Sequence, residues 1–223
     1  MTPRAADASG GAGGDPEGRD PTDPGSGGFE DAVAALRAGA VVAIPTDTVY
    51  GLAVDPTRPG ATDALFALKA RPASLDLPVL VGSVDQADAL AGPGGLSPTA
   101  RRLAQAFWPG ALTVVVPRRR GLDWALGAGV GTIGLRLPDH RVARALCNGV
   151  GALATTSANL HGEAPCTDAA SVARVFGSRV VVVDGGRCAG ATSTVVSVLD
   201  DTPRCLREGA VPWADVAAVL GVG

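Results

Sequence analysis

The chain has 223 residues, enough for one large domain or two small ones, and 46% of them are hydrophobic whereas only 4% are aromatic. We therefore expect a core built from Ala, Val and Leu. No stretch is long and apolar enough for a transmembrane helix, and the N-terminus carries no apolar signal segment, so we expect a cytoplasmic protein without membrane contact.

Residues 1–28 form a segment rich in Gly, Asp, Pro and Ser without apolar periodicity. Such a segment cannot bury enough surface to offset its ordering entropy, so we expect a disordered tail, followed by a single domain over 29–223. The tail has two arginines and five acidic residues, which accounts for the net charge of −3 of the whole chain. The neutral body argues against a protein that holds nucleic acid by bulk electrostatics, although Arg118 to Arg120 could make a weak RNA contact.

The body shows helical and strand periodicities with turn residues between them. In chain order we predict a helix over 29–38, strands over 40–44 and 50–54, a helix over 62–70, a strand over 78–81, helices over 83–91 and 97–107, a strand over 112–116, a loop over 118–131, a strand over 132–137, a helix over 139–147, a strand over 152–155, a helix over 167–176, strands over 179–184, 193–199 and 204–207, and a helix over 213–220. Several strands follow one another directly, which indicates a mixed parallel and antiparallel sheet in an α/β domain.

Two of the predicted helices begin with capping residues. Ser83 and Gln86 stand at capping-box spacing. Ser97 precedes Pro98, which places a cap ahead of a proline at the first helical position. These signals indicate where the two helices start.

The most unusual turn has the sequence PTDTVYGLAVD, over 45–55, after the apolar run 40–44. Pro45 must end that strand because proline cannot donate a hydrogen bond to the ladder. Two threonines, an aspartate and a tyrosine then precede Gly51. Small hydroxyls at the end of a buried strand, beside a glycine that permits a tight turn, suit a small polar ligand. A capped turn leading into a second strand explains them equally well.

Lys69 is the only lysine in a chain with eighteen arginines, and Arg71 follows two residues later. A solitary lysine under this bias suggests a position that needs a compact ammonium rather than a planar guanidinium. Two cations at a helix end could bind a polyphosphate. The alternative is a pair of charges that complements the helix macrodipole.

Three further strand ends carry polar groups. The segment 155–159, TTSAN, ends an apolar strand in three hydroxyls and an amide, which by itself is a weak signal for phosphate or carboxylate binding. Arg136 lies within a strand, where alternation alone favours a solvated outer face over a polar cleft. Ser193 and Arg207 stand at a strand start and a strand end. A cleft on which these ends converge would suit an anionic nucleotide and a small polar co-substrate.

Several common catalytic motifs are absent. The chain has no G-x-x-x-x-G-K-[ST] loop, no G-x-G-x-x-G after a strand and no G-x-S-x-G. Four widely spaced cysteines without a C-x-x-C pair, with only two histidines, argue against a zinc site and favour free buried thiols. We therefore expect neither P-loop nor covalent hydrolase chemistry.

Seven ordered motifs resemble the YrdC-like family. They are PTDTVYGL from Pro45, Lys69-x-Arg71, WPGALTVVV from Trp108, GLRLPDH from Gly134, TSANLHG from Thr156, STVV from Ser193 and LREG from Leu206. Each motif alone is weak, but their order and spacing over about 29–211 are specific. The resemblance implies a YrdC-like fold, a twisted mixed sheet flanked by helices around a large, concave, positively charged cleft.

The resemblance also implies an activity, L-threonylcarbamoyladenylate synthesis. L-Threonine, bicarbonate and ATP would give threonylcarbamoyl-AMP and pyrophosphate, and the product would feed threonylcarbamoyladenosine formation on tRNA through downstream transfer proteins. Mg²⁺ would accompany the phosphates of ATP without a dedicated protein cage. No covalent enzyme intermediate is needed, so the protein would supply orientation and charge stabilisation.

Individual roles follow from the family motifs by resemblance. L-Threonine would be held by Thr48, Arg136, Thr155 and Ser193, with Arg136 on the carboxylate. ATP would be held by Arg71, Thr132, Ser157 and Arg207. The set Lys69, Arg71, Ser157 and Asn159 would surround the reacting phosphate.

The sequence departs from the family pattern at several positions. Many relatives carry a histidine after the short strand that follows K-x-R, and we place that position at Gly82, near the threonine. The frequent proline before the serine of SAN is Thr156, and the usual glutamate before STVV is Thr192. The chain ends soon after LREG, so we expect the short, single-domain type of the family.

Two other functions stay open. One is a non-catalytic RNA-binding or ribosome-maturation protein that uses the wide cleft for RNA, which the neutral body weakens. The other is a related enzyme that performs carbamoyl-adenylate chemistry on another acceptor, which the departures at Gly82 and Thr192 permit.

Overall fold

The computed structural model describes residues 27–70, 75–160, 162–200 and 202–222. Residues 1–26, which include nearly all of the expected tail, and Arg71 lie outside the described residues. The elements are α1 (Gly27–Arg37), β1 (Val42–Ile44), β2 (Gly51–Val54), α2 (Ala61–Lys69), β3 (Val79–Leu80), α3 (Val84–Leu90), α4 (Pro98–Phe107), β4 (Leu112–Pro117), β5 (Thr132–Arg136), α5 (Arg141–Val150), β6 (Leu153–Ser157), α6 (Ala169–Phe176), the 3₁₀ helix η1 (Gly177–Arg179), β7 (Val181–Val182), β8 (Thr194–Ser197), β9 (Arg204–Arg207) and α7 (Trp213–Leu220).

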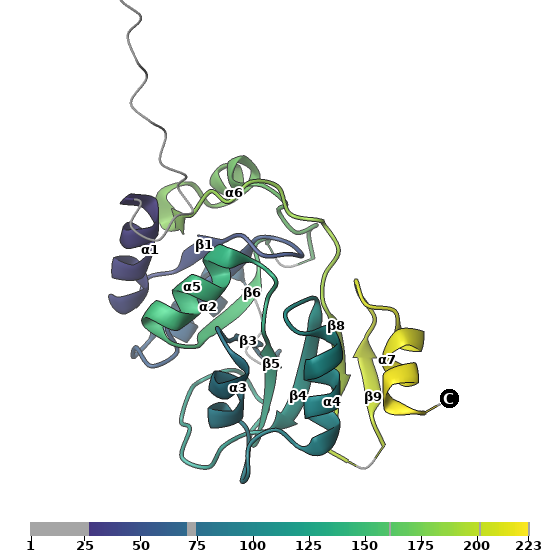
Figure 1. The fold of residues 1–223 in the computed structure, drawn as a ribbon. Coiled ribbons are helices and arrows are strands. Elements are labelled where there is room, and N and C mark those ends of the chain that lie inside the picture. Colours follow the sequence, from purple (N-terminus) through teal and green to yellow (C-terminus); the bar gives the residue numbers. More distant parts are fainter. Residues whose placement is uncertain (1–26, 71–74, 161, 201, 223) are drawn as a thin grey trace, which may run out of the picture.

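The strands form one twisted sheet in the order β7-β1-β2-β6-β3-β5-β4-β8-β9 (Figure 1). The pairs β7–β1, β3–β5 and β4–β8 are parallel, and the pairs β1–β2, β2–β6, β6–β3, β5–β4 and β8–β9 are antiparallel. The predicted mixed sheet flanked by helices is therefore confirmed. Strands that are distant in sequence lie side by side in it, so polar groups from separate segments can meet.

Most predicted elements are confirmed, with their ends shifted by a few residues. The largest difference falls on 179–184, where we predicted one strand. The chain instead makes the 3₁₀ turn η1 and a two-residue strand, β7, which pairs only with β1 at the edge of the sheet. Very short edge strands expose few unpaired backbone groups, which limits edge-to-edge association.

The predicted helix caps are present with one change. The Ser97 hydroxyl accepts from the backbone N–H of Ala100 at 3.2 Å ahead of α4. The Ser83 hydroxyl accepts from the backbone N–H of Gln86 at 3.1 Å ahead of α3. The Gln86 side chain, however, accepts from the N–H of Gly82 at 2.9 Å, one residue before the position that a capping box uses.

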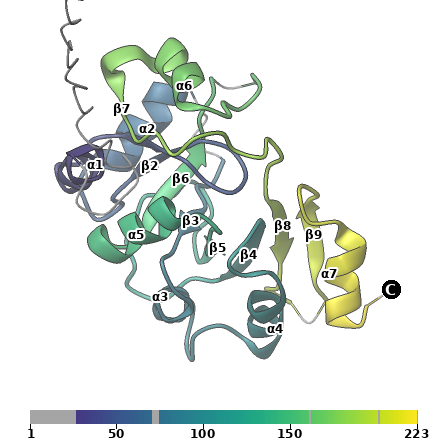
Figure 2. The same cartoon turned by 45° about the horizontal axis from the view of Figure 1, so that its top comes forward.

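One face of the sheet packs into the larger core. Side chains that share this face include Leu52, Val79, Val114 and Leu135, and they pack with apolar residues of α2, α3, α4, α6 and α7. In Figure 2, α2 and α6 lie above the part of the sheet formed by β2 and β6, and α5 lies below it. Apolar side chains dominate this face, although Thr156, the register partner of Leu52, and Thr194, the register partner of Leu112, also lie on it.

The opposite face changes character across the sheet. On β1, β2, β6 and β3 it is apolar and packs against α1 and α5, with Leu80 of β3 and Leu153 of β6 in this second core. Leu80 stands in register with Arg136 of β5, and residues in register on neighbouring strands share a face. The apolar cover therefore ends at Leu80, and polar groups line the same face on β5 and toward the end of β6, where Thr155 follows Leu153 by two residues.

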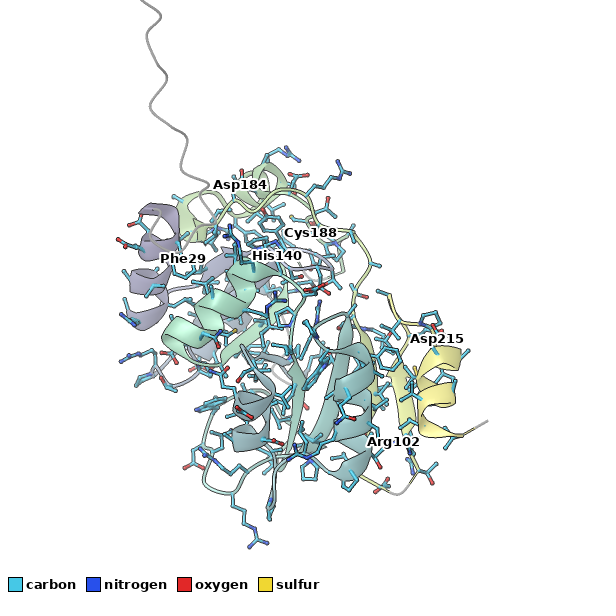
Figure 3. The ribbon with its side chains drawn as sticks, viewed as in Figure 1. Phe29, Arg102, His140, Asp184, Cys188 and Asp215 are labelled. Atoms are coloured by element: carbon cyan, nitrogen blue, oxygen red, sulfur yellow. The ribbon has the colours of Figure 1, made fainter. Side chains whose placement is uncertain are left out.

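The α4–α7 pair lies on the larger core, at the β8–β9 side of the molecule. Figure 3 labels Arg102 of α4 and Asp215 of α7 there, and the Arg102 guanidinium donates to the carbonyl of Val219. Among the described residues no helix is long and apolar enough to cross a membrane. The cysteines are free, as predicted, and three are buried, but Cys205 in β9 is only half-buried, which corrects the expectation of four buried thiols.

Candidate functional site

A cavity of about 120 Å³ opens on the polar part of the sheet face. Within the described part of the chain, eight hydroxyl side chains line it, from Thr46, Thr48, Thr113, Thr155, Thr156, Ser157, Thr192 and Ser193. Arg136 and Arg207 add two guanidinium groups, and Val49, Pro78 and Leu80 add apolar groups. We call it the inner cavity. Its lining suits a small anionic ligand that also carries hydroxyl or amine groups.

A second hollow of about 420 Å³ adjoins the inner cavity. The two share Pro78, Thr113 and Arg207. Thr132 and Ser197 add hydroxyls to this outer hollow, and Asp76 adds a carboxylate. Its apolar lining comes from Leu77, Val115, Leu126, Ile133, Val195, Leu199 and Leu206. A Cβ at Gly134 would lie 3.3 Å from Thr113 Cγ2, so the glycine keeps the floor between the strands flat.

The turn after β1 is both a capped turn and part of the cavity wall. The Thr46 hydroxyl accepts from the backbone N–H groups of Thr48 and Val49 at 3.2 and 3.3 Å and donates to the carbonyl of Val49 at 2.6 Å. These bonds satisfy the turn internally, while the hydroxyls of Thr46 and Thr48 lie 2.9 Å apart at the cavity. The capped turn is therefore confirmed, and ligand recognition by the hydroxyls of this stretch stays a prediction.

Tyr50 fixes this turn to the segment 184–192. Its hydroxyl donates to the carbonyl of Gly186 at 3.0 Å and accepts from the N–H of Gly185 at 3.1 Å, and burial raises the pKa of this phenol to about 12. The N–H of Gly190 donates to the carbonyl of Thr48 at 2.7 Å. The segment crosses beside the turn and delivers Thr192 and Ser193 to the cavity (Figures 1 and 3).

Arg136 is held by three separate segments. Its Nε donates to the carbonyl of Gly110 at 3.0 Å, its Nη1 to the hydroxyl of Thr48 at 2.9 Å and its Nη2 to the carboxylate of Asp47 at 2.6 Å. A guanidinium has five N–H donors, so within the described chain these bonds leave one on each terminal nitrogen for a ligand. Burial lowers the pKa of Arg136, and the neighbouring Asp47 opposes this shift, so the group stays cationic.

Arg136 corrects an expectation from strand alternation. Alternation alone favoured a solvated outer face, but the residue is only 6% exposed and lines the inner cavity. The face that it shares with Thr113 is indeed opposite the main core, as the pattern required. The pattern could not show that the segments with Asp47 and Gly110 enclose it there.

Ser193 and Arg207 form one unit at the other wall. The Arg207 Nη2 donates to the carbonyl of Ser193 at 2.7 Å and to its hydroxyl at 3.2 Å, and that hydroxyl lies 3.0 Å from the hydroxyl of Thr113. Partial burial lowers the pKa of Arg207, which stays cationic. A Cβ at Gly209 would lie 2.3 Å from the carbonyl oxygen of Thr192, so only glycine lets the segment after β9 approach this closely.

Lys69 lies behind the end of β6 rather than among the residues that line the cavity. Its ammonium donates to the hydroxyls of Thr156 and Ser157 at 3.0 and 2.9 Å, to the carbonyl of Ser157 at 2.6 Å and to Asn159 Oδ1 at 2.9 Å. The residue is 2% exposed. A lysine donates in several directions, whereas an arginine fork would not fit this compact shell of oxygens.

Gly82, where we placed the position of the family histidine near the threonine, does not line the inner cavity. A Cβ at Gly82 would lie 2.0 Å from Asn148 Oδ1 and 3.0 Å from the carbonyl of Arg144, so this position faces α5. Along β3 the same face carries Pro78, Leu80 and then Gly82, and the strand runs from the cavity toward the helix. Leu80 is therefore the β3 side chain that stands beside Arg136 at the cavity wall.

The structure brings most of the predicted site residues together. Thr48, Arg136, Thr155, Ser157, Ser193 and Arg207 line the inner cavity, and Thr132 lines the outer hollow. Lys69 and Asn159 lie directly behind Ser157. Thr156 and Thr192, at which the sequence differs from the family pattern, also line the cavity. Arg71 lies outside the described residues.

Sequence reasoning missed Asp47, Thr113 and Leu80. Asp47 carried a signal, because it is the only acid in the PTDT turn and stands beside a hydroxyl that the turn presents. Thr113 carried a weaker one, a polar residue inside an otherwise apolar strand. Leu80 carried none, since an apolar residue in a strand is ordinary core.

An enclosed arginine, a hydroxyl-lined cavity and an adjoining apolar hollow make up a candidate two-compartment small-molecule site on a mixed α/β sheet. Residues 34–209 match the family model Sua5_yciO_yrdC, described as "Telomere recombination". A match over most of the chain shows the family, and the chain belongs to it.

Curated relatives extend this match. A Mycobacterium leprae protein is 43% identical over 199 residues, which cover 87% of this chain and 89% of that protein. The Thiobacillus denitrificans protein named threonylcarbamoyl-AMP synthase is 41% identical over 68% of this chain and 80% of its own length. The Bacillus subtilis protein of the same name is 39% identical over 85% of this chain, which spans 56% of that longer protein.

Solved structures show the same fold. The crystal structure of Pyrococcus abyssi Sua5 complexed with L-threonine has a TM-score of 0.82 at 33% identity and covers 86% of this chain and 57% of that chain. The crystal structure of E. coli YciO has a TM-score of 0.75 at 24% identity, over 82% of this chain and 90% of that chain. The YrdC-like fold that the motifs implied is confirmed.

Proposed function

We propose that this chain is a threonylcarbamoyl-AMP synthase, a nucleotidyltransferase that converts L-threonine, bicarbonate and ATP into threonylcarbamoyl-AMP and pyrophosphate. The observation that carries the proposal is the pair of joined compartments, one with a buried arginine among hydroxyls and one with an apolar floor. The names of the bacterial relatives and the bound L-threonine of the Pyrococcus structure support it. Such a product would be used on tRNA, so we place the protein in the cytoplasm.

In this proposal the inner cavity holds L-threonine. The two N–H groups that Arg136 has left can grip the substrate carboxylate in a bidentate manner. The hydroxyls of Thr48, Thr155 and Ser193 surround the same cavity and can bond the amine and the hydroxyl of the amino acid. The small volume of the cavity favours a ligand of amino-acid size.

The outer hollow holds the nucleoside of ATP. Its apolar walls suit a purine base, and Thr132 offers a hydroxyl for polar groups of the nucleotide. Arg207 lines both compartments, so it stands where the phosphates must pass from one to the other. Ser157, with Lys69 and Asn159 behind it, lines the inner end of that path, and Arg71 joins this set by its motif alone.

The reaction then needs orientation and charge stabilisation. The neutral threonine amine adds to the carbon of bicarbonate and water is lost, or it adds to the carbon of CO₂ and a proton is released to solvent, and either route gives a carbamate. A carbamate oxygen attacks the α-phosphorus of ATP, and the bond from that phosphorus to the bridging oxygen of pyrophosphate breaks. Arg207 and the Lys69–Ser157 unit lie where negative charge develops on the phosphates, and fixed cations in a partly buried site stabilise such charge.

Magnesium enters this proposal with ATP. Among the described residues no group of three or more His, Cys, Asp or Glu side chains could hold a metal ion. The donors at the cavity are hydroxyls, which fit the water shell that Mg²⁺ retains when it is bound through substrate phosphates. The proposed partners are therefore ATP with its metal, L-threonine and bicarbonate, followed by tRNA-modifying transfer proteins.

The test measures pyrophosphate release and the AMP adduct from ATP and bicarbonate, with L-threonine, serine, glycine or no amino acid. We expect release that depends on threonine and an adduct that contains its carbon skeleton. Lys69→Ala should abolish turnover, because the ammonium orients both Ser157 and Asn159. Turnover that ignores threonine would point to another acceptor, and a wild-type chain without turnover would contradict the proposal and favour an RNA-binding role.

A further inference from the structure

Leu80 is an apolar exception in the wall of a polar cavity. Among the described residues that line the inner cavity, most side chains carry hydroxyl or guanidinium groups. Leu80 stands among them with only 3% of its surface exposed, and Pro78 and Val49 are the other apolar side chains of the lining. Hydrogen bonding to the hydroxyls and arginines assigns no part of a ligand to these apolar side chains.

The strand register places Leu80 next to the carboxylate-binding arginine. Leu80 and Arg136 are Cα partners on the parallel strands β3 and β5, and such strands lie about 4.8 Å apart with partner side chains on one face. A carboxylate gripped by Arg136 has its α-carbon one bond away. The substituent on that carbon therefore comes within reach of Leu80.

The side chain of Leu80 is fixed from behind. Its antiparallel partner on β6 is Leu153, and both belong to the core that α5 covers with Val142 and Leu146. Close-packed cores leave a side chain little room to withdraw. Leu80 thus offers a rigid apolar surface at the boundary between core and cavity.

We propose that Leu80 is a specificity-determining residue that receives the β-methyl group of the bound amino acid and so favours threonine over serine. This inference rests on the proposed function. Threonine and serine share the carboxylate, the amine and the hydroxyl, so Arg136 and the surrounding hydroxyls cannot separate them. A methyl group in an apolar pocket separates two ligands by roughly 10- to 200-fold.

The test measures the dissociation constants of L-threonine and L-serine by calorimetry on the full chain. The wild type should prefer threonine, and Leu80→Ala should lower the threonine-to-serine preference about tenfold by weakening threonine binding while serine binding changes little. Leu153→Ala is the matched control, because it opens the same core behind the strand and does not line the cavity. Leu80→Val supplies a milder variant if the alanine variant unfolds.

The outcomes separate this inference from the proposed function. Equal loss of threonine and serine binding in the Leu80 variants, an equal change of preference in Leu153→Ala, or a wild type without preference would overturn the role of Leu80. Pyrophosphate release on the same samples tests the function independently. A wild type that binds threonine selectively through Leu80 but releases no pyrophosphate would sustain the inference and contradict the synthase.

Discussion

At the scale of single residues, Asp47 explains how a buried arginine can remain both charged and available. Its carboxylate lies 2.6 Å from Arg136 Nη2 and also accepts from the backbone N–H of Asp139 at 3.1 Å. Asp47 is not among the residues that line the inner cavity. It therefore compensates the desolvation of the guanidinium and orients it, while the remaining N–H groups stay available for the carboxylate of the proposed substrate.

We expect Arg136→Ala to raise the threonine KM by about tenfold or more, because hydrogen bonds to a charged group contribute about 1.5–3 kcal/mol. The ATP KM should change much less. Arg136→Lys keeps the charge without the planar fork and should restore little of the loss. Steady-state kinetics with each substrate varied in turn check this.

Asp47→Ala is the companion variant. It should also raise the threonine KM, since the guanidinium loses one of its three anchors. Asp47→Asn keeps an acceptor oxygen and should lie between the wild type and the alanine variant. An unchanged threonine KM in Arg136→Ala would remove the residue from the amino-acid subsite.

At the scale of elements, the larger core that stabilises the fold and the cavity lie on opposite faces of the sheet. α4 packs against α7 and the larger core, and the cavity lies on the opposite face. Damage to the start of α4 should therefore weaken the fold without reshaping the cavity. The division follows from strand alternation, which sends neighbouring residues of β4, such as Thr113 and Val114, to opposite faces.

Ser97→Ala tests this division. The Ser97 hydroxyl caps α4 through the N–H of Ala100, and loss of such a cap costs about 1 kcal/mol. We expect the free energy of unfolding in urea to fall by about this amount while the threonine KM stays unchanged. Ser97→Asp keeps a capping oxygen and should restore stability. A raised threonine KM in the alanine variant would show that the two faces are coupled.

At the scale of the whole molecule, periodicity predicted nearly every element, because alternation and caps are local properties of the chain. The side of the sheet that each strand residue faces was also predictable, but what covers that side was not. Arg136 and Gly82 show the difference. The segments with Asp47 and Gly110 enclose Arg136, and α5 covers Gly82, and both arrangements join parts of the chain that are far apart. The family motifs predicted which other residues lie together at the two compartments, because motif order carries information on tertiary contacts that periodicity lacks.

His140 lies where three such distant parts meet. It precedes α5, its Cε1 would lie 3.2 Å from a Cβ at Gly185, and Asp47 is close enough to affect its titration (Figure 3). Its Nδ1 is buried without a hydrogen-bond partner in the described structure. Burial lowers the pKa of His140 below its ordinary value, and Arg144 lowers it further, whereas Asp47, a hydrogen bond to the backbone of Gly185 and Asp139 oppose the shift.

The sign of the resulting pH dependence follows from linkage. As pH falls below about 6.5, the unfolded chain binds a proton at this histidine before the folded chain does, so the folded state loses stability. The contribution of neutral His140 to the free energy of unfolding is fully present above that pH, and it is lost as the pH falls through the lowered pKa of the folded state. We expect His140→Gln to show a smaller fall in the free energy of unfolding between pH 7 and pH 5 than the wild type, measured by urea titration at each pH. Parallel curves for the two proteins would show that His140 stays solvated and does not tie α5 to the segment 184–192.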